Sequence, residues 1–147
     1  CSNTNKSSIG VVIRNGDGLV IASLAQLLNQ AFKVVEIEAL AVACALEFAA
    51  DIRLDNVIVE GDSLVMTQAL KTKVVGLAAY GLLIRDAFSL ARNFSEVSYS
   101  HIKREGNKVA HGLAKLAVNL AKCVIWMEEV PPTIYHLVQV DLASLVQ

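Results

Sequence analysis

The sequence predicts an α/β domain with a mixed sheet and helices packed on it. Two short β-branched segments, at 9–14 and 19–24, flank an Asn-Gly and Asp-Gly turn. This pattern predicts an antiparallel hairpin. Helical and strand-like segments then alternate along the chain, which is typical of a strand–helix–strand unit added to a hairpin.

The remaining elements follow from composition and periodicity. Ala- and Leu-rich segments without Gly or Pro predict the first and last helices, and alternation of side chains predicts the last strand. The expected elements are helices at 35–50, 63–70, 80–93 and 109–122, and strands at 57–59 and 94–102. We expect a domain over residues 1–122 and an apolar C-terminal tail over 123–147, either helical or in contact with another chain.

Composition excludes several classes of protein. The 147 residues correspond to about one domain. Hydrophobic residues make up 54% and charged residues 18%, which excludes a disordered chain. The longest uncharged apolar stretch, 74–84, is too short for a membrane span of about 20 residues, so no membrane partner is expected. The net charge of −1 means that any nucleic-acid binding must depend on a local basic patch.

The cysteines and the N-terminus indicate the cellular context. Cys1, Cys44 and Cys123 are widely spaced and form no Cys-x-x-Cys pair, which argues against a zinc site and a disulfide framework. We therefore expect a reducing, intracellular environment, either nucleus or cytoplasm. The first residues are polar and include no initial Met, so we expect a fragment of a longer protein without a signal peptide.

Glu38 lies within the apolar arc of the predicted helix 35–50. At about 100° per residue it falls between Val42 and Ala45, whereas Glu36 and Glu47 fall on the side expected to face solvent. A carboxylate that points toward a core is costly unless it is paired, hydrogen-bonded or bound to a cation. Glu38 is therefore either paired with an Arg or Lys, or a metal ligand.

Asp62 ends the predicted strand 57–59 at a Gly-Asp-Ser turn. This position predicts an N-cap of the following helix, a role worth about 1 kcal/mol. Strand ends at helix starts are also where α/β folds collect ligands and catalytic groups. If Glu38 and Asp62 converge, their oxygens suit Mg²⁺ or Mn²⁺. Two such ions are suited to phosphodiester hydrolysis.

Three stretches resemble the ribonuclease H family, most closely the ribonuclease H-like domain of plant retroelement reverse-transcriptase-like proteins. E-I-E-A-L-A-V-A-C-A-L at 36–46 is similar to the first helix of the family, with Glu38 at its catalytic Glu. V-I-V-E-G-D-S at 57–63 is similar to the end of its fourth strand, with Asp62 at the catalytic Asp. H-I-K-R-E-G-N-K-V-A-H-G-L-A-K at 101–115 resembles its last strand, basic turn and last helix, and the whole resemblance spans about residues 1–120.

The resemblance implies a five-stranded mixed sheet with helices on both faces. It also implies hydrolysis of the RNA strand of an RNA–DNA hybrid with two Mg²⁺ or Mn²⁺ ions and no small-molecule cofactor. Glu38, Asp62 and His111 are then the catalytic and metal-binding residues of this chain.

The sequence departs from the family in two places. The first catalytic Asp of the family lies on a first strand that precedes residues resembling the start of this chain, so these residues lack both, and an active enzyme requires the intact parent to supply them. These 147 residues alone are then expected to be inactive or nearly so. His111 stands where the family most often has a fourth acidic residue. Its neutral nitrogen can bind a metal, but it adds no negative charge and suits Mg²⁺ less well; the alternative is a polar residue near a helix N-terminus.

A basic segment follows the last predicted strand. The candidate nucleic-acid contacts are Lys103, Arg104, Asn107 and Lys108. Cations beside the carboxylates favour contact with phosphates, which is independent of sequence and sensitive to salt; the alternative is a solvated surface. Lys71 and Lys73 form a weaker second patch.

Three functions are compatible with the sequence. The first is an RNA–DNA hybrid endoribonuclease in the intact parent. The second is a non-catalytic nucleic-acid-binding relic, as the missing Asp and His111 suggest. The third is a protein-interaction module, suggested by the near-neutral charge and high apolarity, with self-association through the apolar tail.

Overall fold

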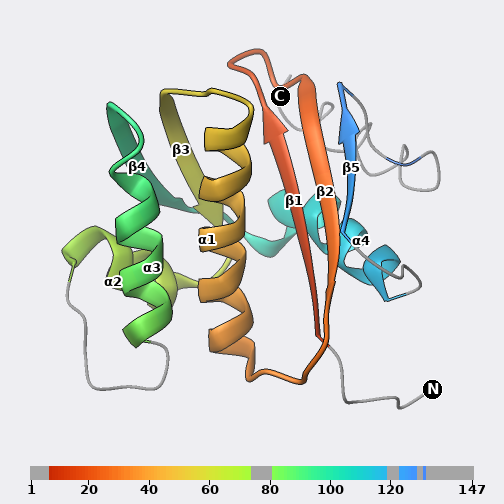
Figure 1. Ribbon diagram of the computed structural model, residues 1–147, viewed down its shortest axis with the longest axis horizontal. Coiled ribbons are helices and arrows are strands. Elements are labelled where there is room, and N and C mark those ends of the chain that lie inside the picture. The colour runs from red at the N-terminus through yellow and green to blue at the C-terminus, as the bar shows by residue number, and fades with distance from the viewer. Residues whose placement is uncertain (1–6, 74–80, 119–122, 129–130, 132–147) are drawn as a thin grey trace. The chain divides into compact units, whose positions relative to one another are not determined.

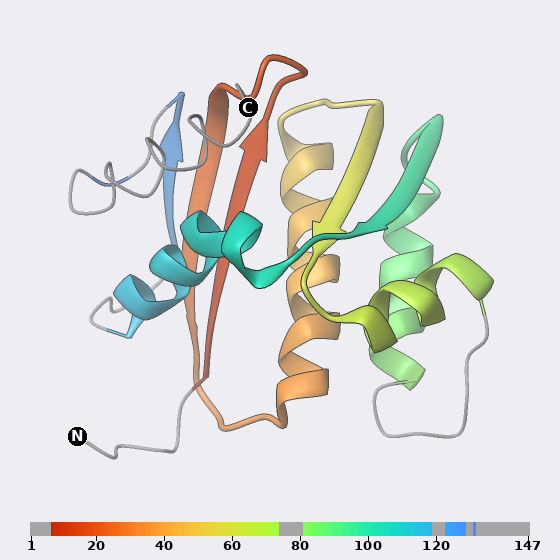
Figure 2. The same ribbon diagram turned by 180° about the vertical axis from the view of Figure 1, so that it is seen from behind.

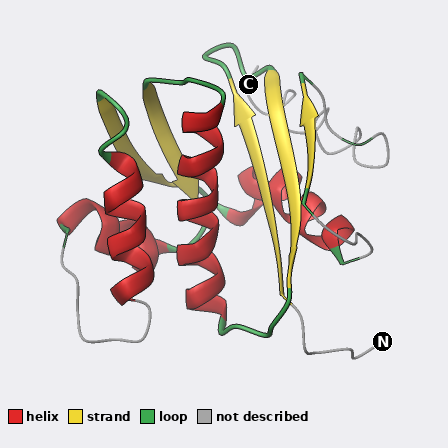
Figure 3. Ribbon diagram, viewed as in Figure 1, coloured by secondary structure: helices red, strands yellow, loops and turns green. Residues whose placement is uncertain are grey.

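The computed structural model of the protein describes residues 7–73, 81–118, 123–128 and 131. The chain divides into two compact units: unit 1 comprises residues 1–32 and 105–147, and unit 2 comprises residues 33–104. Their helices and strands are distinguished in Figure 3. In chain order the elements are β1 (Ser7–Arg14), β2 (Val20–Leu28), α1 (Val34–Asp51), β3 (Asn56–Gly61), α2 (Leu64–Thr72), α3 (Gly81–Ala91), β4 (Glu96–His101), the short 3₁₀ helix η1 (Arg104–Asn107), α4 (Lys108–Ala117) and β5 (Val124–Met127).

Unit 1 is built on the predicted hairpin. β1 and β2 pair antiparallel, and β2 lies between β1 and β5 in a three-stranded sheet. Asn15 forms the turn, because its side-chain Oδ1 accepts the backbone N–H groups of Asp17 at 2.9 Å and Leu19 at 3.0 Å. Gly18 adopts a positive φ of 81°, which glycine tolerates without steric cost. The Asn-Gly and Asp-Gly signal is therefore explained by a side-chain cap and one left-handed residue.

Helix α4 covers one face of this sheet (Figure 2). Its side chains at intervals of four residues, Val109, Leu113 and Ala117, are fully buried and pack with Ala25 of β2. The partly buried hydrophobic residues around this cluster are Val12, Val20 and Trp126. Side chains spaced by one turn of the helix therefore pack against inward-facing side chains of the strands in one apolar core.

The sheet of unit 1 extends beyond residue 122, where the sequence analysis ends the domain. Residues Val124–Met127 form β5, which pairs antiparallel with β2, and Ser23 faces Trp126 across the pair. These four residues are therefore a strand and not part of a helical tail. The expectation for residues 132–147 lies outside the described part of the chain.

Unit 2 combines two parallel strands with three helices. β3 and β4 pair in parallel, and the connection between them carries α2 and α3. α1 packs beside α3, and α2 packs against β4 (Figure 1). The buried hydrophobic residues of unit 2 are Ala39, Leu46, Phe48, Ala49, Met66, Leu70, Ile84, Ala87 and Phe94. This is the predicted strand–helix–strand unit, since parallel strands require a long crossover.

Element boundaries differ from the sequence analysis mainly in α4 and β2. α4 ends at Ala117, and not at residue 122 as predicted. Strand β2 continues to Leu28, because its register with β1 extends to the pair of Ser7 and Leu28. The strand-like pattern of side chains weakens beyond residue 24 of the sequence. Pairing with β1, and not this pattern, therefore determines where β2 ends. Among the described residues, no helix is both long and apolar enough to cross a membrane.

Candidate metal and nucleic-acid site

The carboxyl ends of the two parallel strands of unit 2 form one edge of their sheet. In the register of β3 and β4, Gly61 lies opposite His101, and the backbone N–H of Ile102 donates to the carbonyl of Gly61 at 2.9 Å. Asp62 follows β3 directly, and Lys103 follows Ile102. The parallel pairing therefore brings a carboxylate and the start of the basic segment to the same sheet edge, as is usual for ligand sites in α/β folds.

Ser63 caps helix α2, and the expected capping role of Asp62 is wrong. The Ser63 hydroxyl accepts the backbone N–H of Met66 at 3.2 Å, and the carbonyl of Ser63 accepts the hydroxyl of Thr67 at 2.8 Å. Ser63 has the extended backbone of an N-cap, with φ −92° and ψ 110°, so the helix starts one residue later than Asp62 would require. The half-buried Asp62 thus belongs to the turn between β3 and the cap.

Glu38 lies in the second turn of α1 and is half-buried, whereas Glu47 near the other end of the helix is exposed. This difference agrees with the expected place of Glu38 in the apolar arc. α1 and β3 run in opposite directions (Figure 1). Glu38 lies in the first half of α1, and Asp62 follows the carboxyl end of β3.

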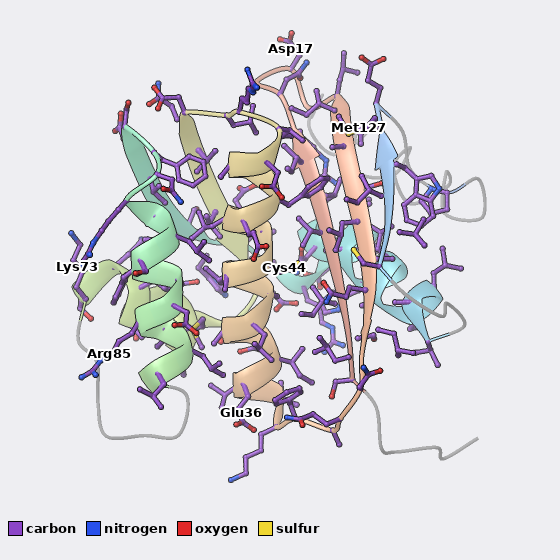
Figure 4. The ribbon with its side chains drawn as sticks, viewed as in Figure 1. Asp17, Glu36, Cys44, Lys73, Arg85 and Met127 are labelled. Atoms are coloured by element: carbon purple, nitrogen blue, oxygen red, sulfur yellow. The ribbon has the colours of Figure 1, made fainter. Side chains whose placement is uncertain are left out.

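Glu36 was expected on the solvent side of α1, and the structure gives it a structural role. Its Oε1 accepts the backbone N–H of Lys33 at 2.9 Å, and it is half-buried at the N-terminal end of the helix (Figure 4). A Glu in the first turn satisfies a backbone donor that lacks a helical partner. Helical periodicity alone does not reveal this, because capping depends on position along the helix.

The other predicted site residues, His111, Asn107 and Lys108, belong to unit 1. His111 is a half-buried residue of α4, in the turn that follows the N-cap Asn107. Asn107 is half-buried and ends η1, and Lys108 is exposed at the first position of α4. Lys103 and Arg104, at the end of unit 2, are exposed as well. The cations of the basic segment are therefore accessible to a ligand.

Within the described part of the chain, no three His, Cys, Asp or Glu side chains form a group that could hold a metal ion. Carboxylate oxygens, such as those of Asp62 and Glu38, are the protein ligands that Mg²⁺ and Mn²⁺ prefer.

His101 is a residue that the predicted site omitted. It is exposed at the last position of β4, opposite Gly61 and next to the turn that holds Asp62. An imidazole nitrogen can donate or accept a hydrogen bond, so its place at this edge is chemically relevant. In the sequence, the alternation of residues 94–102 predicts the strand but not the place of His101 relative to Asp62. The parallel register with β3 is what identifies the position of His101.

Comparisons with known proteins agree with this fold. The sequence profile of the reverse transcriptase-like family matches residues 1–117. RNase H1 from the halophilic archaeon Halobacterium salinarum NRC-1 is 26% identical, with a TM-score of 0.73, and the match covers 80% of this chain and 89% of that chain. The N-terminal RNase H domain of Rv2228c from Mycobacterium tuberculosis has a TM-score of 0.59 at 19% identity, over 78% of this chain and 91% of that chain. No curated protein matches the chain.

The fold and the profile together define the class of this protein. Its α/β architecture matches ribonuclease H folds, which confirms the predicted fold class. The chain belongs to the reverse transcriptase-like family, whose ribonuclease H-like character the sequence motifs indicated.

Proposed function

We propose that this protein is a nucleic-acid-binding ribonuclease H-like domain of retroelement type. In the intact protein it would hydrolyse the RNA strand of an RNA–DNA hybrid. The observation that carries the proposal is the edge of the β3–β4 sheet, at which Asp62 accompanies the exposed cations Lys103 and Arg104. A solved structure with a similar fold is an RNase H1, which supports the same substrate class.

The carboxylates fit divalent ions in their donor chemistry. Glu38 and Asp62 would hold Mg²⁺ or Mn²⁺ through oxygen, and water and phosphate oxygens would complete the coordination. His111, on α4 of unit 1, stays a prediction from the sequence, because a neutral ring nitrogen can bind a metal. Two ions, when bound, supply water activation and stabilisation of the leaving oxygen in phosphodiester hydrolysis.

The side chains themselves have distinct tasks. The half-burial of Glu38 lowers the effective dielectric around its carboxylate, which strengthens its attraction to a cation. Lys103, Arg104 and Lys108 bind backbone phosphates, and Asn107 can hydrogen-bond to them. Because such contacts do not read base identity, the hybrid would be recognised by its shape and 2′-hydroxyls.

Metal binding provides the first test. Titration of the protein with Mn²⁺ should raise its melting temperature, because an ion that binds the folded state stabilises it. Glu38→Gln and Asp62→Asn should each remove most of this increase. Glu47→Gln and Asp51→Asn are matched controls, because they remove the same charges from exposed positions on α1. Equal loss in the controls, or no loss in Glu38→Gln and Asp62→Asn, would contradict the proposed ligands.

Nucleic-acid binding provides the second test. An RNA–DNA hybrid should bind at low salt, with an affinity that falls steeply as salt increases. Mg²⁺-dependent cleavage by the intact protein would establish the endoribonuclease. Binding without cleavage by the intact protein would favour the non-catalytic relic, which the histidine at position 111 makes the second candidate. Absence of binding at low salt would contradict both.

A further inference from the structure

The turn between β1 and β2 holds Asn15, the only asparagine of the sequence that is followed by a glycine. Asn15, Gly16 and Asp17 are exposed, and Figure 4 shows Asp17 at the outer end of the hairpin. The backbone nitrogen of the residue after an asparagine can attack the side-chain amide carbon. Glycine leaves this nitrogen accessible because it has no Cβ. The pair of Asn15 and Gly16 therefore has the residue types for a reaction within the chain.

The folded turn holds the side-chain amide of Asn15 in a defined position. Its Oδ1 accepts the backbone N–H groups of Asp17 at 2.9 Å and Leu19 at 3.0 Å. The backbone of Asn15 is held as well, since its N–H donates to the carbonyl of Leu19 at 2.9 Å. Two N–H groups on a carbonyl oxygen stabilise the negative charge that develops there when a nucleophile adds to the carbon. The contacts that form the turn therefore also activate Cγ of Asn15.

The backbone nitrogen of Gly16 is accessible for this attack. Among the residues that the structure describes, none accepts a hydrogen bond from the Gly16 N–H. A Cβ added at Gly16 would meet no atom within 4 Å beyond its chain neighbours. The next pair, Asp17 and Gly18, differs, because Gly18 is buried and its N–H donates to the carbonyl of Asn15 at 3.0 Å. The turn thus exposes a nucleophile at Gly16 and not at Gly18.

We infer that Asn15 is a site of spontaneous deamidation in the folded protein, a modification that does not depend on the proposed function. The Gly16 nitrogen loses its proton and forms a bond to Cγ of Asn15. The bond between Cγ and Nδ2 breaks, and the amide group leaves with this proton as ammonia. One water molecule then opens the resulting succinimide at either of its two carbonyls. The products are an aspartyl or an isoaspartyl residue at position 15, and the reaction needs no oxidant or reductant.

The two products affect the hairpin differently. An aspartyl side chain can accept the same two N–H groups, and it adds one negative charge. In the isoaspartyl product the main chain runs through Cβ and Cγ, which lengthens the turn. The carbonyl that accepts the Gly18 N–H then no longer belongs to the main chain. We therefore expect Asn15→Asp to be as stable as the wild type and the isoaspartyl protein to be less stable.

Incubation of the full chain at mildly alkaline pH in isotopically labelled water tests the inference. Peptide mapping by mass spectrometry should show that one labelled oxygen replaces the amide group at position 15, with both products separable by chromatography. Asn93 is the internal control, because it is exposed but is followed by Phe94, and it should stay intact. Gly16→Ala is the matched variant, because its Cβ has room, and it should react several-fold more slowly than the wild type.

Comparison with the unfolded chain tests the role of the turn. In urea the two N–H donors to Oδ1 are lost, so we expect the native protein to react at least as fast as the unfolded protein. A slower reaction in the native protein would show that the turn protects Asn15, and would overturn the inference. An Asn15 that stays as intact as Asn93, or that reacts equally fast in Gly16→Ala, would overturn it as well.

Discussion

Gly10 in β1 lies directly against the backbone of Ala110 in α4. A Cβ added at Gly10 would overlap the Ala110 carbonyl oxygen and would lie 2.6 Å from the backbone nitrogen of Ala114. Backbone atoms inside a helix cannot rotate away from such a contact. The absence of a side chain at Gly10 thus allows α4 to approach the sheet of unit 1 closely.

Gly10→Ala should therefore destabilise the protein strongly. The added methyl group must displace α4 from the sheet, and overpacking of this kind costs about 3 kcal/mol. Gly16→Ala is the matched control, because no atom lies within 4 Å of a Cβ at Gly16. Urea denaturation of both variants measures the difference. A Gly10→Ala protein as stable as Gly16→Ala would show that α4 does not pack closely on β1.

Local patterns in the sequence predicted most of the fold. The hairpin follows from the Asn15 turn, and helical periodicity distinguishes the half-buried Glu38 from the exposed Glu47 but not from Glu36. Features that depend on distant partners were not predicted. The role of Gly10 depends on α4, which is far away in the sequence, and β5 is recognisable only through its pairing with β2.

In the candidate site, too, the features that depend on backbone geometry or on distant partners were not predicted. Residue types and motifs identified Glu38, Asp62 and the basic segment. They did not distinguish Asp62 from Ser63 as the cap, because the cap is set by backbone geometry at a single residue. They also omitted His101, whose relation to Asp62 comes from the parallel register of β3 and β4.

Ser63→Ala should lower the free energy of unfolding by about 1 kcal/mol, because the N–H of Met66 loses its partner at the start of α2. Ser63→Asp should retain most of the stability, since an Asp side chain caps equally well and its charge suits a helix N-terminus. Thermal unfolding of the two variants gives the comparison. Equal destabilisation by Ala and Asp would argue against the cap.

Ser95 connects the start of β4 to the residue that precedes β3. Its hydroxyl lies 2.8 Å from both carboxylate oxygens of Asp55, and its backbone N–H donates to Oδ1 at 3.0 Å. A double-mutant cycle with Ser95→Ala and Asp55→Ala should give a coupling energy of about 1 kcal/mol or less, because the site is exposed. The backbone contact persists in Ser95→Ala, so the cycle isolates the hydroxyl. Additive single changes would show that the hydroxyl contributes nothing.

Glu38→Gln should leave the metal-free protein as stable as the wild type or more stable. The change removes a half-buried charge, whose desolvation opposes folding. Glu36→Ala is the contrasting variant, because it removes the acceptor of the Lys33 N–H and should lower stability. Both are measured by urea denaturation in the presence of EDTA. A large loss of stability in Glu38→Gln would mean that the carboxylate is held by a strong interaction within the protein, and its assignment as a metal ligand would then fail.

Tyr99 should make stability sensitive to alkaline pH. Burial raises the pKa of its phenol above the ordinary value of 10.0, because desolvation disfavours the phenolate. The folded state therefore holds this proton more tightly than the unfolded state does. The contribution of the Tyr99 proton to stability is fully present below about pH 10 and is lost as the pH rises through the pKa of the folded state.

Tyr99→Phe cannot ionise and removes this contribution, so the free energy of unfolding should fall less in the variant than in the wild type between about pH 8 and pH 11. Because the two proteins differ only at residue 99, the difference between the two pH profiles isolates Tyr99, and identical profiles would show that its phenol is solvated.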